Sequence, residues 1–264
     1  MLNKIIVNDK DIKFNLNDNI KYKILSNDND IIKVISLDIL NSDKLKIEYN
    51  IKEEIKINFI INIQKNISFK LIDEKIGFNI KSKYQYILSE NSDIVVNKIN
   101  DGEKIREFDL IDLNGINSKL NYVLKTISSS EEHYDILVNH NAKNTTSDVI
   151  TDGINIDKGK LILNVTGIVS KGKTGTVVNQ VNHIINLTDN KCQINPNLLI
   201  DEMDAVANHS AHISNFTDED LFYLMSRGIN KNNAFKLLIK GLLMDKIMNE
   251  ENEYIDRIIK KYWR

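Results

Sequence analysis

About two hundred residues alternate apolar and polar side chains with a period of two, and this pattern constrains the fold more than any other feature. Residues 54–63 are representative, with apolar side chains at every second position: Ile55, Ile57, Phe59, Ile61 and Ile63. Successive side chains of a β-strand point to opposite faces, so the alternation predicts strands with one buried face. No helical period of convincing length occurs before about Thr217. The chain up to that point is therefore expected to be mainly β.

The turn signals between these strands restrict the architecture further. The chain has 10 glycines and 1 proline, and Asn114–Gly115 is the one clear two-residue hairpin signal. A sandwich or barrel usually has tighter hairpin turns, whereas a parallel β-helix stacks strands in successive turns and can hold ladders of asparagine. Because no strict repeat length is readable, a β-helix is favoured but a sandwich stays open.

The pattern changes to that of helices at Thr217. Thr217 is a suitable N-cap with three acidic residues behind it, and Gly228 stands where a left-handed residue ends a helix. Asn230 can cap a second helix, and a third is expected around Tyr254 to Ile259. We therefore predict a β core over residues 1–215, with a variable N-terminal part of about 100 residues, and a helical subdomain over residues 216–264.

The composition excludes several classes of protein. The net charge is −2, from 35 basic and 37 acidic residues, so neither a nucleic-acid nor a membrane partner is expected. A single cysteine, Cys192, excludes a disulfide framework. The N-terminus has no signal-peptide pattern and no apolar run is long enough to span a membrane, so a cytoplasmic location is expected.

One segment matches the phosphate-binding loop pattern of nucleotide hydrolases letter for letter. It is GIVSKGKT, from Gly167 to Thr174, with the apolar run LLIDE following at Leu198 to Glu202. Such a loop works by opening a helix whose N-terminus faces the phosphates. Here Gly175, Thr176, Val177 and Val178 follow, which are poor helix formers and indicate a strand. A nucleotide hydrolase is therefore the least favoured interpretation.

The C-terminal half resembles the SufB/SufD family of iron–sulfur cluster assembly proteins over roughly 130 residues. The resemblance is carried, in order, by VNHNAKNTTSDVITDGI, NVTGIVSKGKTGTVVNQVNHIINL, NPNLLIDEMDAVANHSAHIS and, most specifically, DEDLFYLMSRGINKNNAFKLLIKGLL. It implies a right-handed parallel β-helix core with a C-terminal α-helical subdomain. It also implies a dimer formed through the core and a SufC-like ABC ATPase docked on the helices. Lys143 stands where many members have proline.

The resemblance suggests a ligand pair for a transient iron–sulfur cluster. Cys192 stands near the position of a cysteine in SufB-like members, and His209 aligns with the family histidine. Thiolate is the preferred ligand of such clusters and neutral imidazole is a borderline one. One cysteine and one histidine are too few, so a dimer would have to bring Cys192 of one copy beside His209 of the other. The alternatives are a buried apolar cysteine and a histidine at a subunit contact.

The other histidines carry less weight. His212 would face away from His209 in a strand and is expected at the surface, and His140 is expected to order a turn. His133 and His183 fall outside the family motifs.

In the helices, Phe222, Tyr223 and Arg227 are the residues that we assign to partner binding. For the two aromatic residues the alternative is the core of the helical subdomain. Arg227 could instead bind the last carbonyls of its helix.

The function that we infer is that of a non-enzymatic scaffold, with no catalytic residues, that assembles and transfers an iron–sulfur cluster with a SufC-like ATPase. A homodimer is favoured over a heterodimer with a second SufB/SufD-like subunit, because this chain carries both Cys192 and His209. The alternative is a SufD-like structural partner that binds no cluster itself.

Overall fold

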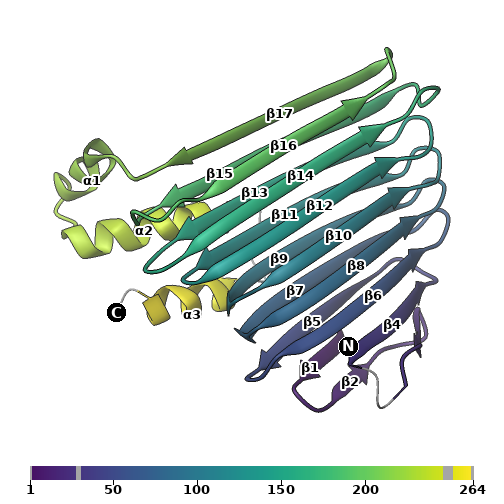
Figure 1. The fold of residues 1–264 in the computed structure, drawn as a ribbon, viewed down its shortest axis with the longest axis horizontal. Helices are drawn as coiled ribbons and strands as arrows, with labels where there is room; N and C mark the ends of the chain where they lie inside the picture. Colours follow the sequence, from purple (N-terminus) through teal and green to yellow (C-terminus); the bar gives the residue numbers. More distant parts are fainter. Residues whose placement is uncertain (1, 28–30, 246–251, 263–264) are drawn as a thin grey trace.

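The computed structural model describes residues 2–27, 31–245 and 252–262, and it is a parallel β-solenoid of about seven turns with 59% of its residues in strands. Each turn contributes one strand to each of two facing sheets, and three helices follow at the C-terminus (Figure 1). The predicted mainly β core with C-terminal helices is confirmed. The sandwich is excluded because the strand pairs are parallel, apart from one antiparallel pair at the N-terminal edge of each sheet.

The strands divide between the sheets by alternation along the chain. The first sheet, sheet A, has the order β17 (Ala205–Ser214), β15 (Thr176–Asn186), β13 (Thr146–Asn155), β11 (Lys119–Ser128), β9 (Asp93–Glu103), β7 (Ser68–Phe78), β5 (Asp43–Ile51), β1 (Asn3–Asn8), β2 (Ile12–Asn15). The second, sheet B, has the order β16 (Gln193–Ile200), β14 (Lys160–Val169), β12 (Glu131–His140), β10 (Arg106–Leu113), β8 (Ile80–Leu88), β6 (Ile55–Ile63), β4 (Ile32–Ile39), β3 (Ile20–Ile24). The helices are α1 (Asp218–Met225), α2 (Lys231–Met244) and α3 (Asn252–Tyr262).

The turns of the solenoid differ in length, which is why no repeat is readable in the sequence. Ser68 on β7 pairs with Asp93, 25 positions later, whereas Thr146 on β13 pairs with Val177, 31 positions later. The strands keep their register while the connecting loops absorb the difference. The strand–corner–strand unit therefore repeats in the structure, as the pairing of successive strands shows, but not at a fixed spacing in the sequence.

The period-two pattern directs its apolar side chains into the space between the sheets. On β6 the five alternate positions from Ile55 to Ile63 are all buried, and the lysines and asparagines between them are partly exposed. One continuous cluster of such side chains fills the solenoid from β1 to β15. The alternation therefore predicts this core correctly.

Asparagines recur at the same corner of successive turns, although the unequal loop lengths obscure their spacing in the sequence. Four corner asparagines have positive φ angles between 53° and 61°: Asn66, Asn91, Asn117 and Asn144. Asparagine tolerates this left-handed conformation better than most residues. The Asn91 amide donates to Asn66 Oδ1 at 3.1 Å, and the Asn117 amide donates to Asn91 Oδ1 at 2.8 Å. The stacked corners thus form the asparagine ladder expected of a β-helix.

The N-terminal end of the solenoid is closed by antiparallel strands. β2 pairs with β1, and β3 pairs with β4, each in antiparallel register. In contrast, Asn114–Gly115 turns the chain between β10 and β11, which lie in different sheets, so the hairpin that this dipeptide suggested is absent there. The dipeptide does form a turn, but this turn connects strands of two different sheets at a corner of the solenoid.

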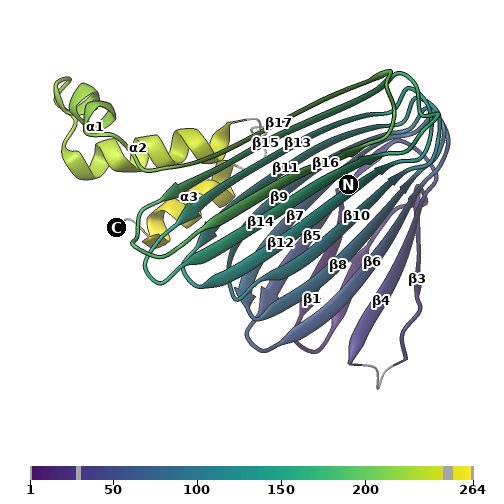
Figure 2. The same ribbon diagram turned by 45° about the horizontal axis from the view of Figure 1, so that its top comes forward.

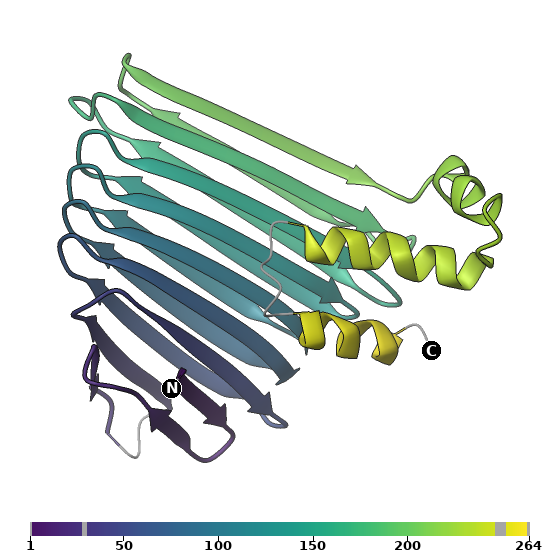
Figure 3. The same ribbon diagram turned by 180° about the vertical axis from the view of Figure 1, so that it is seen from behind.

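Helices α2 and α3 pack on the outer face of sheet A (Figures 2 and 3). Their apolar side chains form a second core with isoleucines of β9, β11 and β13: Ile99, Ile127, Ile154, Ile239, Leu243, Tyr254, Ile255 and Ile258. The predicted caps are confirmed: Thr217 forms a capping box with Asp220, and Asn230 accepts from the Asn233 amide at 2.9 Å. Gly228 has a φ of 84°, as the left-handed helix end requires.

Candidate functional site

The last turn of the solenoid, formed by β16 and β17, is open. Among the described strands, β16 pairs with β14 alone and β17 with β15 alone, so each is the edge strand of its sheet. Most of β17 is exposed, including its inward-facing positions His209 and Ala211. An unpaired edge above an uncovered core is a surface that another chain can extend.

Cys192 lies on the inner side of this turn. It directly precedes β16, is half-buried, and packs against the main apolar core together with Ile194. Burial raises the pKa of the Cys192 thiol, an effect that the Leu161 backbone partly offsets. At neutral pH the isolated chain therefore presents a thiol rather than the thiolate that metals bind.

His209 faces the same space from the opposite sheet. It is in register with Gln180 on β15, whose side chain is 2% exposed and reaches across the interior to the Asn197 carbonyl at 3.3 Å. The Oε1 atom of Gln180 is buried and accepts no hydrogen bond from the described residues. The inner surface beneath His209 thus carries an unsatisfied acceptor at the open end of the solenoid.

Within one chain Cys192 and His209 are not positioned as a ligand pair. His209 is in register with Gln180, whose side chain reaches the Asn197 carbonyl on β16, whereas Cys192 precedes Asn197 by five residues. Five residues of strand span about 16 Å. Across the described ranges no group of three or more histidine, cysteine, aspartate or glutamate side chains is arranged to hold a metal ion.

Helix α1 presents a second surface at the same end of the molecule, where Figure 1 shows it beyond the end of β17. Phe222 is 73% and Tyr223 is 56% exposed, and α1 buries no residue, so the alternative of a core role for these two aromatics is wrong. The Arg227 guanidinium lies over the Tyr223 ring, 4.5 Å from its centroid. The three residues assigned to partner binding therefore form one exposed aromatic and cationic surface.

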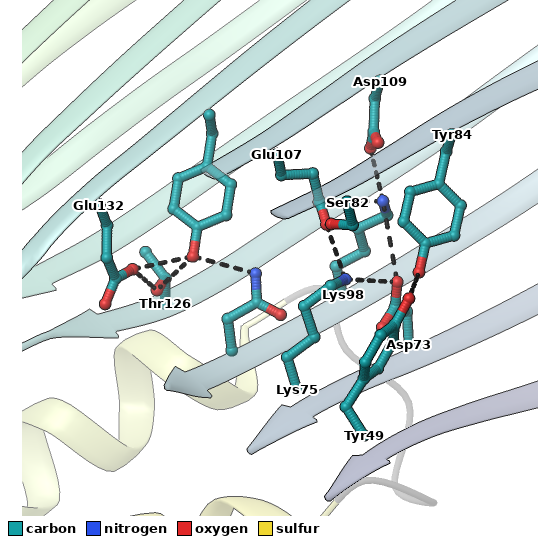
Figure 4. A network of polar contacts seen from close by, with 12 residues as sticks. Tyr49, Asp73, Lys75, Ser82, Tyr84, Lys98, Glu107, Asp109, Thr126 and Glu132 are labelled. Atoms are coloured by element: carbon teal, nitrogen blue, oxygen red, sulfur yellow. Dashed lines mark hydrogen bonds and ion pairs between the residues drawn. The ribbon is translucent and has the colours of Figure 1, made fainter. Parts of the chain in front are cut away.

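The interior of the middle turns holds a charged network that the sequence reasoning missed (Figure 4). Lys75 and Lys98 are fully buried between the sheets. The Lys75 ammonium lies 2.6 Å from Asp73 and 2.7 Å from Glu107, and that of Lys98 lies 2.6 Å from Asp109 and 3.0 Å from Glu107. Two ammonium groups thus face three carboxylates.

The pKa values indicate how this cluster balances its charge. Burial opposes the charged form of Glu107, but Lys75 and Lys98 outweigh it and hold the Glu107 pKa well below its usual range. For Asp109 burial dominates and the nearby Glu107 adds to it, so the Asp109 pKa is raised despite Lys98. One proton retained on Asp109 leaves the cluster neutral, which lowers the cost of burying it.

A neighbouring carboxyl, that of Glu132, is also buried, and no cation of the described residues forms an ion pair with it. It accepts hydrogen bonds from Thr126 Oγ1 and the Tyr134 hydroxyl, each at 2.8 Å, while its Oε1 atom has no partner in the described part of the chain. Burial raises the pKa of Glu132 to about 8. The group is therefore mostly protonated at neutral pH.

A signal for the network was present in the sequence. The alternation on β9 places Lys98 and Asn100 on the same face as Ile94 and Val96, so a charged residue occupies an inward position. Polar residues at core positions of an otherwise strict pattern indicate a buried polar cluster.

Two further positions behave as the sequence indicated. His140 is buried between Thr145 and Ser147, with hydrogen bonds of 2.8 and 2.9 Å, and burial lowers its pKa to about 4, consistent with a neutral residue that orders the turn. The phosphate-loop match begins in β14 and ends in the turn before β15, so a strand rather than a helix follows it. The Gly172 amide already donates to Glu202, at 2.7 Å. The nucleotide-hydrolase interpretation therefore has no structural support.

The described helices include none that is long and apolar enough to cross a membrane.

The fold places the chain in the class of repeat proteins with a parallel β-solenoid, here with exposed edge strands at one end and helices packed on one face. Comparison with known families narrows this class. Residues 57–242 match the model described as "SUF system FeS cluster assembly, SufBD core domain", so the chain belongs to the SufBD family. The match begins at residue 57 and thus includes part of the first hundred residues, which the sequence resemblance did not reach.

Two curated relatives agree with this assignment. The iron–sulfur cluster assembly protein SufD of Bacillus subtilis is 32% identical over 120 residues, which cover 45% of this chain and 27% of the relative. An iron–sulfur cluster assembly SufBD family protein of Mycobacterium leprae is 41% identical over 70 residues, covering 26% of this chain and 18% of the relative. The matched segments thus span about a quarter or less of each relative.

Proposed function

We propose that this chain is a scaffold subunit of a SUF-type assembly complex, on which a nascent iron–sulfur cluster is built and from which it is passed on. The cluster is the cargo of the scaffold, and the chain itself carries out no catalysis. The observation that supports this most directly is the open last turn, with Cys192 and His209 on its inner surface, in a chain of the SufBD family.

Two copies joined at their open ends would supply a more complete ligand set. Pairing of edge strands would extend both sheets and cover the inner faces of β16 and β17. A two-fold axis would double each ligand and could place Cys192 of one copy near His209 of the other, which the separation within one chain does not allow. The unsatisfied Gln180 Oε1 would then lie inside the joined interior.

The raised pKa of Cys192 implies a task for the ATPase partner in this proposal, which is to promote deprotonation of the thiol. The thiol must lose its proton before it binds iron, and a change in its packing against the core would lower the pKa. We infer that a SufC-like ATPase, docked on α1 at Phe222, Tyr223 and Arg227, drives such a change. Helix α1 suits this task because it directly follows β17 and exposes its apolar face.

The second candidate is a SufD-like structural partner that stabilises a separate, cluster-bearing subunit. It is favoured by the half-buried position of Cys192 and by the Bacillus subtilis relative, which bears the name SufD. In that case the open end would be covered by a different β-solenoid chain at a one-to-one ratio.

Anaerobic reconstitution with iron and sulfide, with and without the ATPase, tests the proposal. We expect cluster-like absorbance from the wild type and at least a tenfold loss in both Cys192→Ser and His209→Ala. His133→Ala is the matched control, because His133 lies on the outer face of β12. Equal uptake by wild type and Cys192→Ser would exclude Cys192 as a ligand. Co-purification with a second solenoid subunit, without cluster uptake, would establish the structural role instead.

A further inference from the structure

A row of polar residues crosses the outer face of sheet A, on the side opposite to the main core. Four residues occupy one register position on four adjacent strands: Lys125 on β11, Asp152 on β13, His183 on β15 and His212 on β17. The burial decreases along the row, from the fully buried Lys125 to the exposed His212 on the edge strand. The row thus leads from beneath helix α2 to the solvent at the open end.

The inner half of the row is held in place by ionic contacts. The Lys125 ammonium is bonded to Asp152 and also donates to the Leu242 carbonyl in the last turn of α2, at 2.9 Å. The Asp152 side chain is 8% exposed, and its Oδ1 atom lies 3.9 Å from His183 Nδ1. A carboxylate on this side of the imidazole favours the tautomer with the proton on Nδ1, so the Nε2 lone pair can accept a hydrogen bond or bind a metal.

The outer half of the row has the spacing of two imidazoles on one metal ion. The ring centroids of His183 and His212 are 5.3 Å apart, with 30° between the ring planes. A metal ion 2.0–2.1 Å from a ring nitrogen lies about 3.2 Å from that ring's centroid, so two rings on a tetrahedral ion have centroids about 5.2 Å apart. His183 Nε2 points to β17, where it contacts the Ser214 hydroxyl at 3.1 Å.

We propose that His183 and His212 form a binding site for a divalent first-row transition-metal ion, with Asp152 as the residue that positions His183. Imidazole suits zinc, iron, nickel and copper in their divalent states. The described residues supply two nitrogen ligands here, and water, together with the Ser214 hydroxyl, would occupy the remaining positions. Many metal-binding histidines are oriented by a carboxylate next to the ring nitrogen that does not bind the metal. Asp152, held by Lys125, has this role for His183.

This site is separate from the proposed cluster site. His209 and His212 are three residues apart on β17, so their side chains leave the strand on opposite faces, one toward the solenoid interior and the other toward the outside. Metal binding by His183 and His212 therefore does not depend on Cys192. Its test also stands whether or not the chain carries clusters.

The experiment titrates the untagged, metal-free chain with Zn²⁺ in competition with a chromophoric chelator, and repeats the titration with Co²⁺ to follow its ligand-field bands. We expect one equivalent per chain, a loss of affinity of at least tenfold in His183→Ala and in His212→Ala, and a similar loss in Asp152→Asn. His133→Ala is the control, because it removes a half-exposed histidine from the other sheet. Cys192→Ser should bind zinc as the wild type does.

Asp152→Asn also removes an ion pair, so the folded state of each variant is checked by circular dichroism before titration. His212→Ala is the decisive variant, because His212 is exposed and its loss should leave the fold intact. Equal zinc affinity in the wild type and His212→Ala would overturn the proposal, as would equal losses in His133→Ala and His212→Ala.

Discussion

The middle of the solenoid and its last turn share the same strand pattern but differ in the burial of their inward-facing polar residues. In the middle turns, Lys75 and Lys98 are sealed between the sheets and bonded to three carboxylates. At the last turn the inward positions His209 and Ala211 of β17 are exposed, one of them polar and the other small. The difference indicates that polar groups in the middle serve the chain's own stability, whereas those at the end are available to another molecule.

The largest expected effect is in the middle turns. Lys98→Met keeps the length of the side chain but removes the cation that pairs with Asp109 and leaves Glu107 paired with Lys75 alone. Breaking a buried ion pair from one side costs about 3–5 kcal/mol, so the free energy of unfolding should fall by that amount in urea denaturation. Lys83→Met, on the exposed outer face of β8, is the matched control and should cost less than about 1 kcal/mol. Equal decreases in the free energy of unfolding of the two variants would contradict the prediction that the buried ion pairs of Lys98 stabilise the chain.

A second prediction concerns pH in the same region. Glu132 has its pKa raised from 4.5 to about 8 in the folded chain, so the folded state binds a proton that the unfolded state has lost. The contribution of this group is complete below pH 4.5 and is lost as the pH rises to 8, so the free energy of unfolding decreases across that window. Glu132→Gln should remove this dependence and gain a few kcal/mol on the wild type between pH 5 and pH 8.5.

The control for that measurement is Glu131→Gln, whose side chain is exposed and paired with Arg106. It should leave the pH profile of the wild type unchanged. A profile that is as steep in Glu132→Gln as in the wild type would show that another group takes up the proton.

The third prediction addresses the open end. Ala211→Asp places a carboxylate on the inner face of the last turn, where we propose that a second solenoid docks, and should weaken self-association by at least tenfold in sedimentation experiments. Ser210→Asp, one residue earlier and facing outward, should have a much smaller effect. The free energy of unfolding of the monomer should change little in either variant, because both positions are exposed. A chain that stays monomeric at all concentrations would refute the homodimer.

The smallest expected effect on stability is at helix α1. Phe222→Ala should change the free energy of unfolding by less than about 0.5 kcal/mol, because the side chain is 73% exposed. The same variant should weaken binding of the ATPase by at least tenfold in calorimetry. Leu237→Ala, an exposed position on α2, is the control for binding. A loss of stability near 2 kcal/mol would instead show that Phe222 is part of the core.

The strands, the helix caps and the change of pattern at Thr217 could all be predicted, because they depend on local alternation and capping chemistry. The corner asparagines were not recognised, because loops of unequal length hide their spacing. The charged network was missed for a different reason: an inward lysine is interpretable only when its partners are known, and Lys98 meets Glu107 and Asp109 from another strand. Cys192 and His209 were identified by resemblance alone, and their role as ligands stays a prediction.

The sequence by itself determined that the chain forms strands with one apolar face followed by capped helices, because period and capping are properties of neighbouring residues. Only the tertiary structure decided which strands are neighbours and that one end is left open. It also decided that His183 and His212, 29 positions apart, face each other on adjacent strands. Such relations depend on the register between strands, and register is set by the packing of all turns together rather than by any one segment.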